Sequence, residues 1–436
     1  MRDLLVTAIV FGLIPVILKR PWIGILAWSW LSYMNPHRLT WGFAYSMPFA
    51  QMVALATFMG LLFSQEKKSL PMNGTTVLWV VFVLWMGLTS LTAIYPEAAL
   101  SYYMRVLKIQ VIAFLTVMIV RDKYRLNCLI WVIALSIGFF SIKGGIFTLM
   151  TGGQYRVRGP SDSMIGENNA MGLAALMIIP FFFYLRSIAE NVWLKRALLG
   201  GLVLSIISAL GSQSRGALIS MCVLGIYFWW QSKNKLVSGI VIVILAGIGL
   251  TVMPASWHER MSTITEFQED SSAMSRIYAW KYSINLANDK VLGGGYNSWS
   301  KPTYAIYQPQ AIGVFVAHSI YFNVLADHGW VGLILFLSIF FMTWRNLTIS
   351  DRLCRGSPAN ADLSTLARML KVSLVAYAGG GAFLSLSYYD LPWHLVAFGV
   401  ILRNLATSSI TYGSAELVAP VSNKPARRRL ERRAST

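Results

Sequence analysis

The sequence predicts an all-α polytopic membrane protein with about 12–13 transmembrane helices and one large, partly helical periplasmic loop. Hydrophobic residues make up 56% of the 436 positions and charged residues only 13%, which excludes an ordinary soluble globule. The mean hydropathy is +0.56. Apolar runs recur along the chain at the length of one bilayer crossing, and the sixteen Trp suit interfacial belts.

The expected helices follow directly from these apolar runs. With thirteen spans the N-terminus lies outside. The first two segments are short, so the number of spans could also be twelve. The first segment ends without a small-residue cleavage site, so we interpret it as a retained helix. The predicted spans are 4–18, 22–34, 43–63, 76–94, 104–120, 126–149, 168–186, 193–212, 215–231, 235–253, 318–344, 366–388 and 391–409.

The distribution of Lys and Arg predicts the orientation. Alternate loops are rich in these residues and are expected in the cytoplasm, which leaves the poorly basic loops on the outer side. We therefore expect a multi-pass membrane protein with four parts and a cytoplasmic C-terminus. They are N-terminal transmembrane helices (1–253), a large periplasmic loop (254–317), C-terminal transmembrane helices (318–410) and a basic cytoplasmic tail (411–436).

The net charge of +19 would suggest nucleic acid in a soluble protein. Here most basic residues lie in short loops that orient helices, so we expect membrane lipids as partners and no nucleic acid. The three cysteines, Cys128, Cys222 and Cys354, lie in spans or in a cytoplasmic loop, so no disulfide is expected.

Cations also cluster near the outer boundary, where they could bind phosphate. They are Arg105, Lys108, Arg156, Arg158 and Arg215. For each one alone, contact with lipid headgroups is the simpler interpretation. Arg215 differs, because it opens a helix after the Gly- and Ser-rich turn "GSQS", where free backbone N–H groups already favour an anion.

The long outer loop offers a second arginine in the same setting. Residues 271–289 predict an amphipathic helix with an apolar stripe of Ile277, Trp280, Ile284 and Ala287. Arg276 lies in its first turn, and the glycines of "VLGGGYNSW" end it. Simple packing of this helix is the alternative to a functional role.

A histidine then stands at the mouth of a membrane helix, in "GVFVAHSIYFNVLADHGW". Ionisable residues there are costly, so we favour a functional His318 over one that caps a helix or bonds a carbonyl. His328 lies about 280° further round a straight helix and cannot share its site.

These motifs together resemble the O-antigen ligase family, membrane glycosyltransferases related to the O-antigen polymerases. The resemblance rests on "RVRGP", "IGENNAMG", "SQSRGA", "SRIYAW", "LGGGYNSW" and "AHSIYFNVLADHGWVGL", in this order. The opening "NPHRLTWGFAYSMPFAQ" is similar to the subgroup of O-glycosylation ligases near exosortase systems.

The resemblance implies a glycosyltransferase that moves a glycan from undecaprenyl diphosphate to a sugar hydroxyl of lipid A–core on the periplasmic side of the bacterial inner membrane. His318 is then the general base, and Arg215 and Arg276 are catalytic and bind the diphosphate. Further substrate-binding residues are expected among Arg156, Arg158, Arg105, Lys108, Asn168 and Tyr321.

No metal or other cofactor is expected, because the first outward loops offer only Glu97 and arginine can neutralise a diphosphate. The residues leave open a polymerase, a protein O-oligosaccharyltransferase and a lipid-linked glycan transporter. A transporter is disfavoured because the ionisable residues crowd one end of the spans instead of their middle.

Overall fold

The computed structural model describes residues 1–66, 68–262 and 271–418, and within these ranges the chain forms helices and loops without a strand. The predicted all-α polytopic membrane architecture is confirmed. Six described helices are long and apolar enough to cross a membrane: Gly74–Leu91, Pro96–Ile119, Lys123–Met150, Asn168–Ile188, Val192–Gly211 and Ile320–Cys354. The total of 12–13 crossings stays a prediction.

Each predicted span contains a helix, and local sequence explains several of the boundaries. Asn73, Asp122 and Ser214 each accept a backbone N–H in the first turn of the helix that follows. The helices of the N-terminal part are α1 (Arg2–Lys19), α2 (Pro21–Met34), α3 (Phe49–Phe63), α4 (Gly74–Leu91), α5 (Pro96–Ile119), α6 (Lys123–Met150), α7 (Asn168–Ile188), α8 (Val192–Gly211), α9 (Arg215–Gln231) and α10 (Lys235–Val252).

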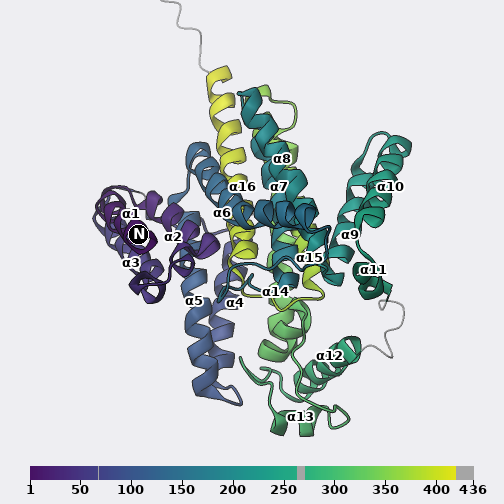
Figure 1. Ribbon diagram of the computed structural model, residues 1–436. Coiled ribbons are helices and arrows are strands. Elements are labelled where there is room, and N and C mark those ends of the chain that lie inside the picture. Colours follow the sequence, from purple (N-terminus) through teal and green to yellow (C-terminus); the bar gives the residue numbers. More distant parts are fainter. Residues whose placement is uncertain (67, 263–270, 419–436) are drawn as a thin grey trace, which may run out of the picture.

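The remaining helices include those of the long loop. They are α11 (Ala255–Ser262), α12 (Ser271–Asp289), α13 (Lys301–Tyr307), α14 (Ile320–Cys354), α15 (Ala361–Gly381) and α16 (Asp390–Val418). Short 3-10 turns, η1 (Pro36–Leu39), η2 (Phe43–Ser46) and η3 (Pro358–Asn360), lie in loops. Figure 1 shows α12 and α13 at the end of the molecule opposite the C-terminal end of α16. Residues 419–436, most of the predicted tail, lie outside the described residues.

Three predicted boundaries were wrong in ways that matter. The span 43–63 is a 3-10 turn followed by α3, because Pro48 precedes the helix. Helix α5 begins at Pro96, eight residues before the predicted span 104–120, so Arg105 and Lys108 lie within it and not at its head. Helix α15 ends at Gly381, the last of three consecutive glycines, so residues 382–389 form a loop where the span 366–388 was expected.

Loops that were predicted on the same side of the membrane contact one another. Arg125 forms an ion pair with Glu66 at 2.8 Å, which joins two of the basic loops. On the other side, the Val157 amide donates to the Gly211 carbonyl at 2.9 Å. The contacts agree with the predicted grouping of the loops, and the assignment of one group to the periplasm stays a prediction.

Helix α14 is broken at Gly329, whose φ of +67° and ψ of −172° are not helical. Helical hydrogen bonding cannot continue through such a residue, and membrane-embedded carbonyls need other donors. The Ala326 carbonyl accepts from the Gly294 amide at 2.8 Å, and the Asp327 carbonyl accepts from the Gly295 amide at 3.0 Å. The His328 carbonyl accepts from the indole of Trp85 at 3.0 Å. The glycine turn after α12 (residues 293–295) therefore supplies hydrogen-bond donors to carbonyls at the break in α14.

Helix α12 has the predicted bounds but a different buried face. Its fully covered side chains include Ala279, Tyr282, Leu286 and Ala287, whereas Ile277 and Ile284 of the predicted stripe are only half-buried. The predicted stripe is thus confirmed only at Ala287, and it omitted Tyr282, which belongs to the buried face. Tyr282 and Leu286 pack with Tyr304, Tyr307 and Ala326 in a small separate core. This core holds the long loop against α14.

Candidate functional site

A cavity of about 370 Å³ lies where the long loop meets α5, α7, α14 and the 382–389 loop. It is therefore on the end of the molecule that the sequence assigns to the periplasm. Its lining residues come from segments far apart in the chain: Tyr102, Ser163, Met164, Glu167, Ala170, Tyr296, Asn297, Trp299, Val316, His318, Asn323, Asp327, Leu384, Ser385 and Leu386.

His318 lines this cavity two residues before α14 begins. Its φ of +42° is left-handed, an uncommon conformation for a residue other than glycine that often marks functional sites. The N-cap of α14 is Ser319, and neither ring nitrogen of His318 hydrogen-bonds to any residue that the structure describes. The alternative interpretation as a cap or carbonyl ligand was wrong. The imidazole is half-buried and turned to the cavity.

Arg276 is brought to His318 by the helix that carries it. The indole Nε1 of Trp280, one turn further along α12, donates to the Ala317 carbonyl at 2.9 Å. Since residues i and i+4 share a helix face, this bond places Arg276 beside the segment that ends in His318. Burial lowers the pKa of His318, and the positive charge of Arg276 lowers it further. The imidazole is therefore neutral, and able to accept a proton, to lower pH than an exposed histidine.

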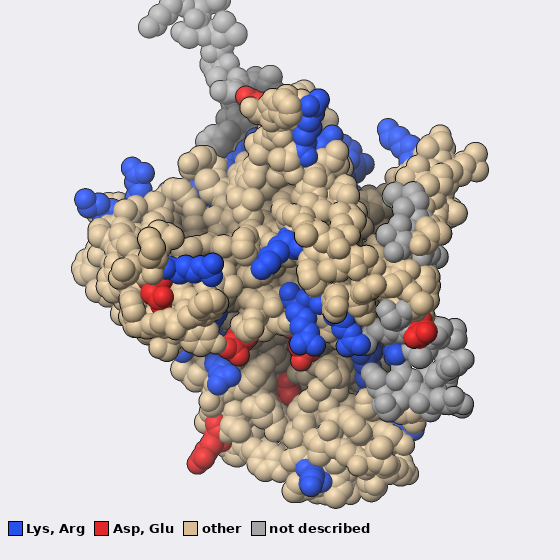
Figure 2. Space-filling model, viewed as in Figure 1, with Lys and Arg blue, Asp and Glu red and all other residues tan. Residues whose placement is uncertain are grey.

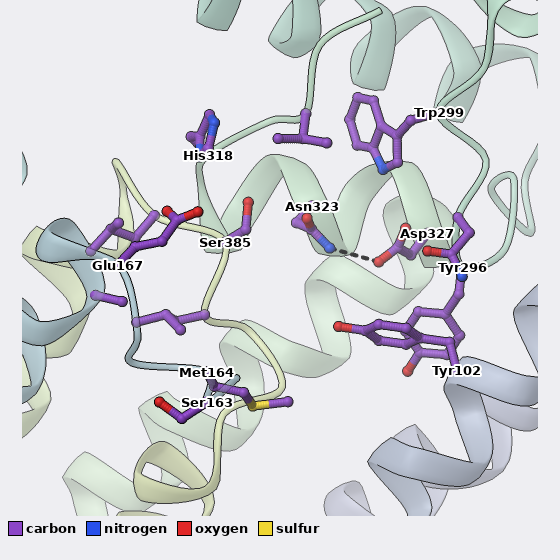
Figure 3. Close-up of a pocket in the computed structure, with 15 residues that line it drawn as sticks. Tyr102, Ser163, Met164, Glu167, Tyr296, Trp299, His318, Asn323, Asp327 and Ser385 are labelled. Atoms are coloured by element: carbon purple, nitrogen blue, oxygen red, sulfur yellow. Dashed lines mark hydrogen bonds between the residues drawn. The ribbon is translucent and has the colours of Figure 1, made fainter. Parts of the chain in front are cut away.

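Glu167 is a site residue that sequence reasoning missed. It precedes α7 and its carboxylate points toward His318 in Figure 3. This negative charge opposes the effect of Arg276 and raises the pKa of His318. Its place next to "NN" in the "IGENNAMG" motif is the signal that could have found it. A carboxylate there can stabilise an imidazolium once a proton has been taken up.

Arg215 is the first residue of α9, as predicted, and is half-buried. Asn168 anchors the turn before it, because its side-chain amide donates to the Ser212 carbonyl at 2.8 Å. The helix start also packs on the 382–389 loop: a Cβ built on Gly216 would lie 3.2 Å from the Cβ of Phe383. Phe383 adjoins Leu384 of the cavity wall, so Arg215 stands close behind that wall.

Two segments of the chain match known protein families. Residues 200–337 match the O-antigen ligase family. Residues 1–190 match a family of unknown function, DUF5935. No curated protein matches the chain.

The O-antigen ligase segment supplies Arg215, Arg276 and His318 from one matched range. The DUF5935 segment supplies Tyr102 and Glu167 to the same cavity. The cavity lining thus comes from both matched segments and from residues 384–386, which lie beyond them. The match supports a lipid-linked glycan transferase of the O-antigen ligase superfamily, and it leaves the exosortase-associated subgroup as a prediction.

The other predicted substrate-binding residues lie outside the cavity lining. Arg156 and Arg158 are exposed on the segment that runs beside the turn before α9. Arg105 and Lys108 are exposed on α5, with Arg105 one turn from the cavity residue Tyr102. Tyr321 faces α15 instead, where its hydroxyl donates to the Ala378 carbonyl at 2.8 Å. Their roles in substrate binding stay predictions.

Asp327 is the second residue that sequence reasoning missed. It is 2% exposed and lines the cavity from α14, just before the break at Gly329. Two carboxylates, Glu167 and Asp327, therefore line the cavity. His328, by contrast, points away from it and bonds the Thr89 hydroxyl at 2.7 Å.

The charge around the site is unevenly placed. Figure 2 shows Lys and Arg side chains gathered along the edge of a hollow in this face, with Asp or Glu side chains inside it. The described lining residues of the cavity include no Lys or Arg. Within the described ranges, no group of three or more His, Cys, Asp and Glu is placed to hold a metal ion. Positive charge therefore lies at the edge of the hollow, on Lys and Arg side chains.

Proposed function

We propose that this protein is an O-antigen ligase that transfers a polysaccharide from undecaprenyl diphosphate to a sugar hydroxyl of lipid A–core. The reaction takes place on the periplasmic side of the bacterial inner membrane. The observation that carries the proposal is the placement of Arg276 near His318, which lines the cavity, on a helix that the hydrogen bond from Trp280 to Ala317 fixes against this segment. The family match of residues 200–337 supports the reaction class.

The mechanism is a single displacement. The acceptor hydroxyl oxygen attacks the anomeric carbon of the donor sugar while its proton passes to the neutral imidazole of His318. The bond between the anomeric carbon and the diphosphate oxygen breaks, and the diphosphate leaves with the electron pair. One displacement inverts the anomeric configuration. Glu167 stabilises the imidazolium that results, as the direction of its effect on the pKa of His318 indicates.

Arg215 and Arg276 bind the diphosphate in this proposal. Arg215 is the first residue of α9, where backbone N–H groups add to the guanidinium charge. The predicted first-turn position of Arg276 was wrong: α12 begins at Ser271, so Arg276 is its sixth residue and acts through its own charge. Positive charge that is fixed where negative charge develops usually contributes more to such catalysis than any other effect, about 10²–10³ in rate for one donor. No metal enters the reaction as proposed, because the arginines neutralise the leaving group.

The test is a transfer assay with purified protein, a lipid-diphosphate-linked glycan and lipid A–core. We expect core-linked product with the anomeric configuration opposite to that of the donor, read by NMR of the new linkage. Retention of configuration would contradict the single displacement.

A deletion strain distinguishes the ligase from its relatives. Loss of the whole lipopolysaccharide ladder above core, with lipid-linked polymer accumulating, supports the ligase. A single repeat on core would instead identify a polymerase, and an intact ladder with an unglycosylated protein substrate would identify a protein O-oligosaccharyltransferase.

A further inference from the structure

Asp327 occupies a position that the proposed displacement leaves without a role. Its carboxyl group receives two hydrogen bonds, from the amide of Asn323 at 2.7 Å and from the hydroxyl of Tyr388 at 3.0 Å. Both fall on Oδ2. The other oxygen, Oδ1, has no hydrogen-bond partner among the residues that the structure describes, although Asp327 lines the cavity. One carboxyl oxygen is thus held by the protein and the other is left for a ligand.

The carboxyl group is also fixed by the backbone beneath it. The Asp327 carbonyl accepts from the Gly295 amide at the break in α14, so the residue is tied to both α14 and the glycine turn. The two hydrogen bonds to Oδ2 fix the orientation of the carboxyl group, and Oδ1 is not among the buried polar atoms that lack a partner in the described residues, so it is accessible from the cavity. The arrangement is that of a binding group.

Aromatic side chains form the walls around this carboxyl group. The rings of Tyr102 and Tyr296 lie 4.9 Å apart on one side. Trp299 lines the cavity from the other side, and Figure 3 shows its indole above Asp327 and Asn323. Trp299 is itself fixed by packing on Tyr282, with ring centroids 4.8 Å apart.

The lining chemistry selects a class of ligand. A diphosphate would find no Lys or Arg among the described lining residues, so it belongs at the arginine-bearing rim. A sugar ring offers an apolar face for an aromatic wall and several hydroxyl groups for a carboxyl and an amide. Aromatic walls with a few fixed polar groups are typical of sites for such small ligands.

We propose that Asp327 and Trp299 form a saccharide subsite, in which sugar hydroxyls hydrogen-bond to Oδ1 of Asp327 and the ring packs on the indole of Trp299. This inference rests on the proposed function, since it takes the cavity as the place where glycans meet. The saccharide is either the acceptor or the sugar part of the donor, and the two are separated by the experiment below. Asp327 is a positioning and specificity residue here, and His318 remains the base.

The decisive variant is Asp327→Asn. Its amide oxygen can still accept from Asn323 and Tyr388, so the protein contacts are kept and only the cavity-facing oxygen becomes an NH₂ donor. The matched control is Asp289→Asn, because Asp289 lies on α12 outside the cavity lining and bonds Tyr307 at 2.8 Å. Trp299→Leu and Trp299→Phe test the wall, and thermal unfolding in detergent verifies that each variant is folded.

Two probes are titrated separately: delipidated core oligosaccharide, and a short-chain prenyl diphosphate carrying one glycan repeat. We expect Asp327→Asn to weaken binding of one of them about 10-fold, with Asp289→Asn unchanged. Trp299→Leu should act on the same probe, and Trp299→Phe should act less. The affected probe identifies the occupant. Equal binding of both probes by Asp327→Asn and wild type would overturn the subsite.

The result is independent of the transfer reaction. If wild-type protein transfers nothing but binds the oligosaccharide more tightly than Asp327→Asn does, the proposed ligase activity fails and the subsite stands. If wild type transfers glycan and a folded Asp327→Asn shows unchanged KM for both substrates, the subsite fails and the ligase activity stands. A loss of kcat alone at unchanged KM would also overturn the subsite, because it would place Asp327 in the chemical step.

Discussion

The amide of Gly295 donates a 3.0 Å hydrogen bond to the carbonyl of Asp327, and this contact joins the long outer loop to the interior of a broken membrane helix. The neighbouring Gly294 makes the same type of bond to Ala326 and accepts one from the Ile94 amide at 2.9 Å. The glycine turn therefore lies between α14 and the end of α4, with backbone in contact with backbone on both sides.

Only glycine fits at position 295, so Gly295→Ala should destabilise the fold. Its φ is +73°, and an added Cβ would lie 2.1 Å from the Cβ of Ala93. The left-handed conformation costs about 1–2 kcal/mol for another residue, and forced overpacking adds about 1–3 kcal/mol. Thermal unfolding in detergent measures the sum.

Gly152→Ala is the control, because Gly152 has a φ of +61° with nothing within 4 Å of the added Cβ. It should show the conformational cost alone. Equal destabilisation by the two substitutions would contradict the packing explanation.

The orientation gives a second prediction. A cysteine at Lys301, exposed between the glycine turn and α14, should react with an impermeant maleimide added to intact spheroplasts. A cysteine at Tyr124, which is 68% exposed among the basic loops, should react only after permeabilisation. The native Cys128, Cys222 and Cys354 are replaced first. The reverse labelling pattern would invert the topology.

Most of the fold could be predicted from the sequence, because hydropathy over about 20 residues is set by the solvent that each helix meets. The ends of helices were harder. Nothing in periodicity shows that α14 breaks at Gly329, since a glycine within an apolar run is compatible with a continuous helix. The prediction that His328 lies about 280° round the helix from His318 assumed a straight helix. It therefore missed both the break and the hydrogen bond between His328 and Thr89.

The site was predictable only in part, for the same reason. Arg215 is the first residue of α9 and His318 lies two residues before α14, so local sequence identifies them. Arg276 is identified by its place on the helix predicted over 271–289. Glu167 and Asp327 act through neighbours that are distant in sequence: Asp327 is held by Tyr388, 61 residues away. Contacts of that range are set by packing, which a single sequence does not display.

The arginines give a third prediction. Arg215→Ala and Arg276→Ala should each lower kcat/KM for the diphosphate donor about 10²–10³-fold. Replacement by Lys should restore only part of this, because one ammonium cannot bind a phosphate with two parallel hydrogen bonds. Initial rates over a range of donor concentrations measure the effect.

Arg158→Ala is the control for charge alone, since Arg158 is exposed on the loop beside the turn before α9. Its effect should be several times smaller. A donor kcat/KM for Arg215→Ala equal to that of wild type would remove the diphosphate site from the mechanism.

The proposed charge compensation by arginine gives a fourth prediction. Purified protein treated with EDTA and transferred to metal-free buffer should keep its transfer rate. The described residues offer two cavity carboxylates, Glu167 and Asp327, and no cluster of three metal-binding groups. A complete loss of activity that magnesium or manganese restores would show that a cation shares the work assigned to the arginines.

His318 gives the last prediction, and its pH dependence is the most specific test of the proposed base. Transfer needs the neutral imidazole, so the rate falls as pH drops through the pKa of His318. Burial and Arg276 lower that pKa, so wild-type activity should persist to a pH below the ordinary histidine value of about 6.5.

Arg276→Gln removes one of the two causes that lower the pKa of His318, so the acid limb of its residual activity should move to higher pH. Glu167→Gln should move the acid limb to lower pH, because Glu167 raises the pKa of His318. His318→Ala should lose transfer while binding the donor normally. Acid limbs that stay fixed in both variants would show that another group takes the proton.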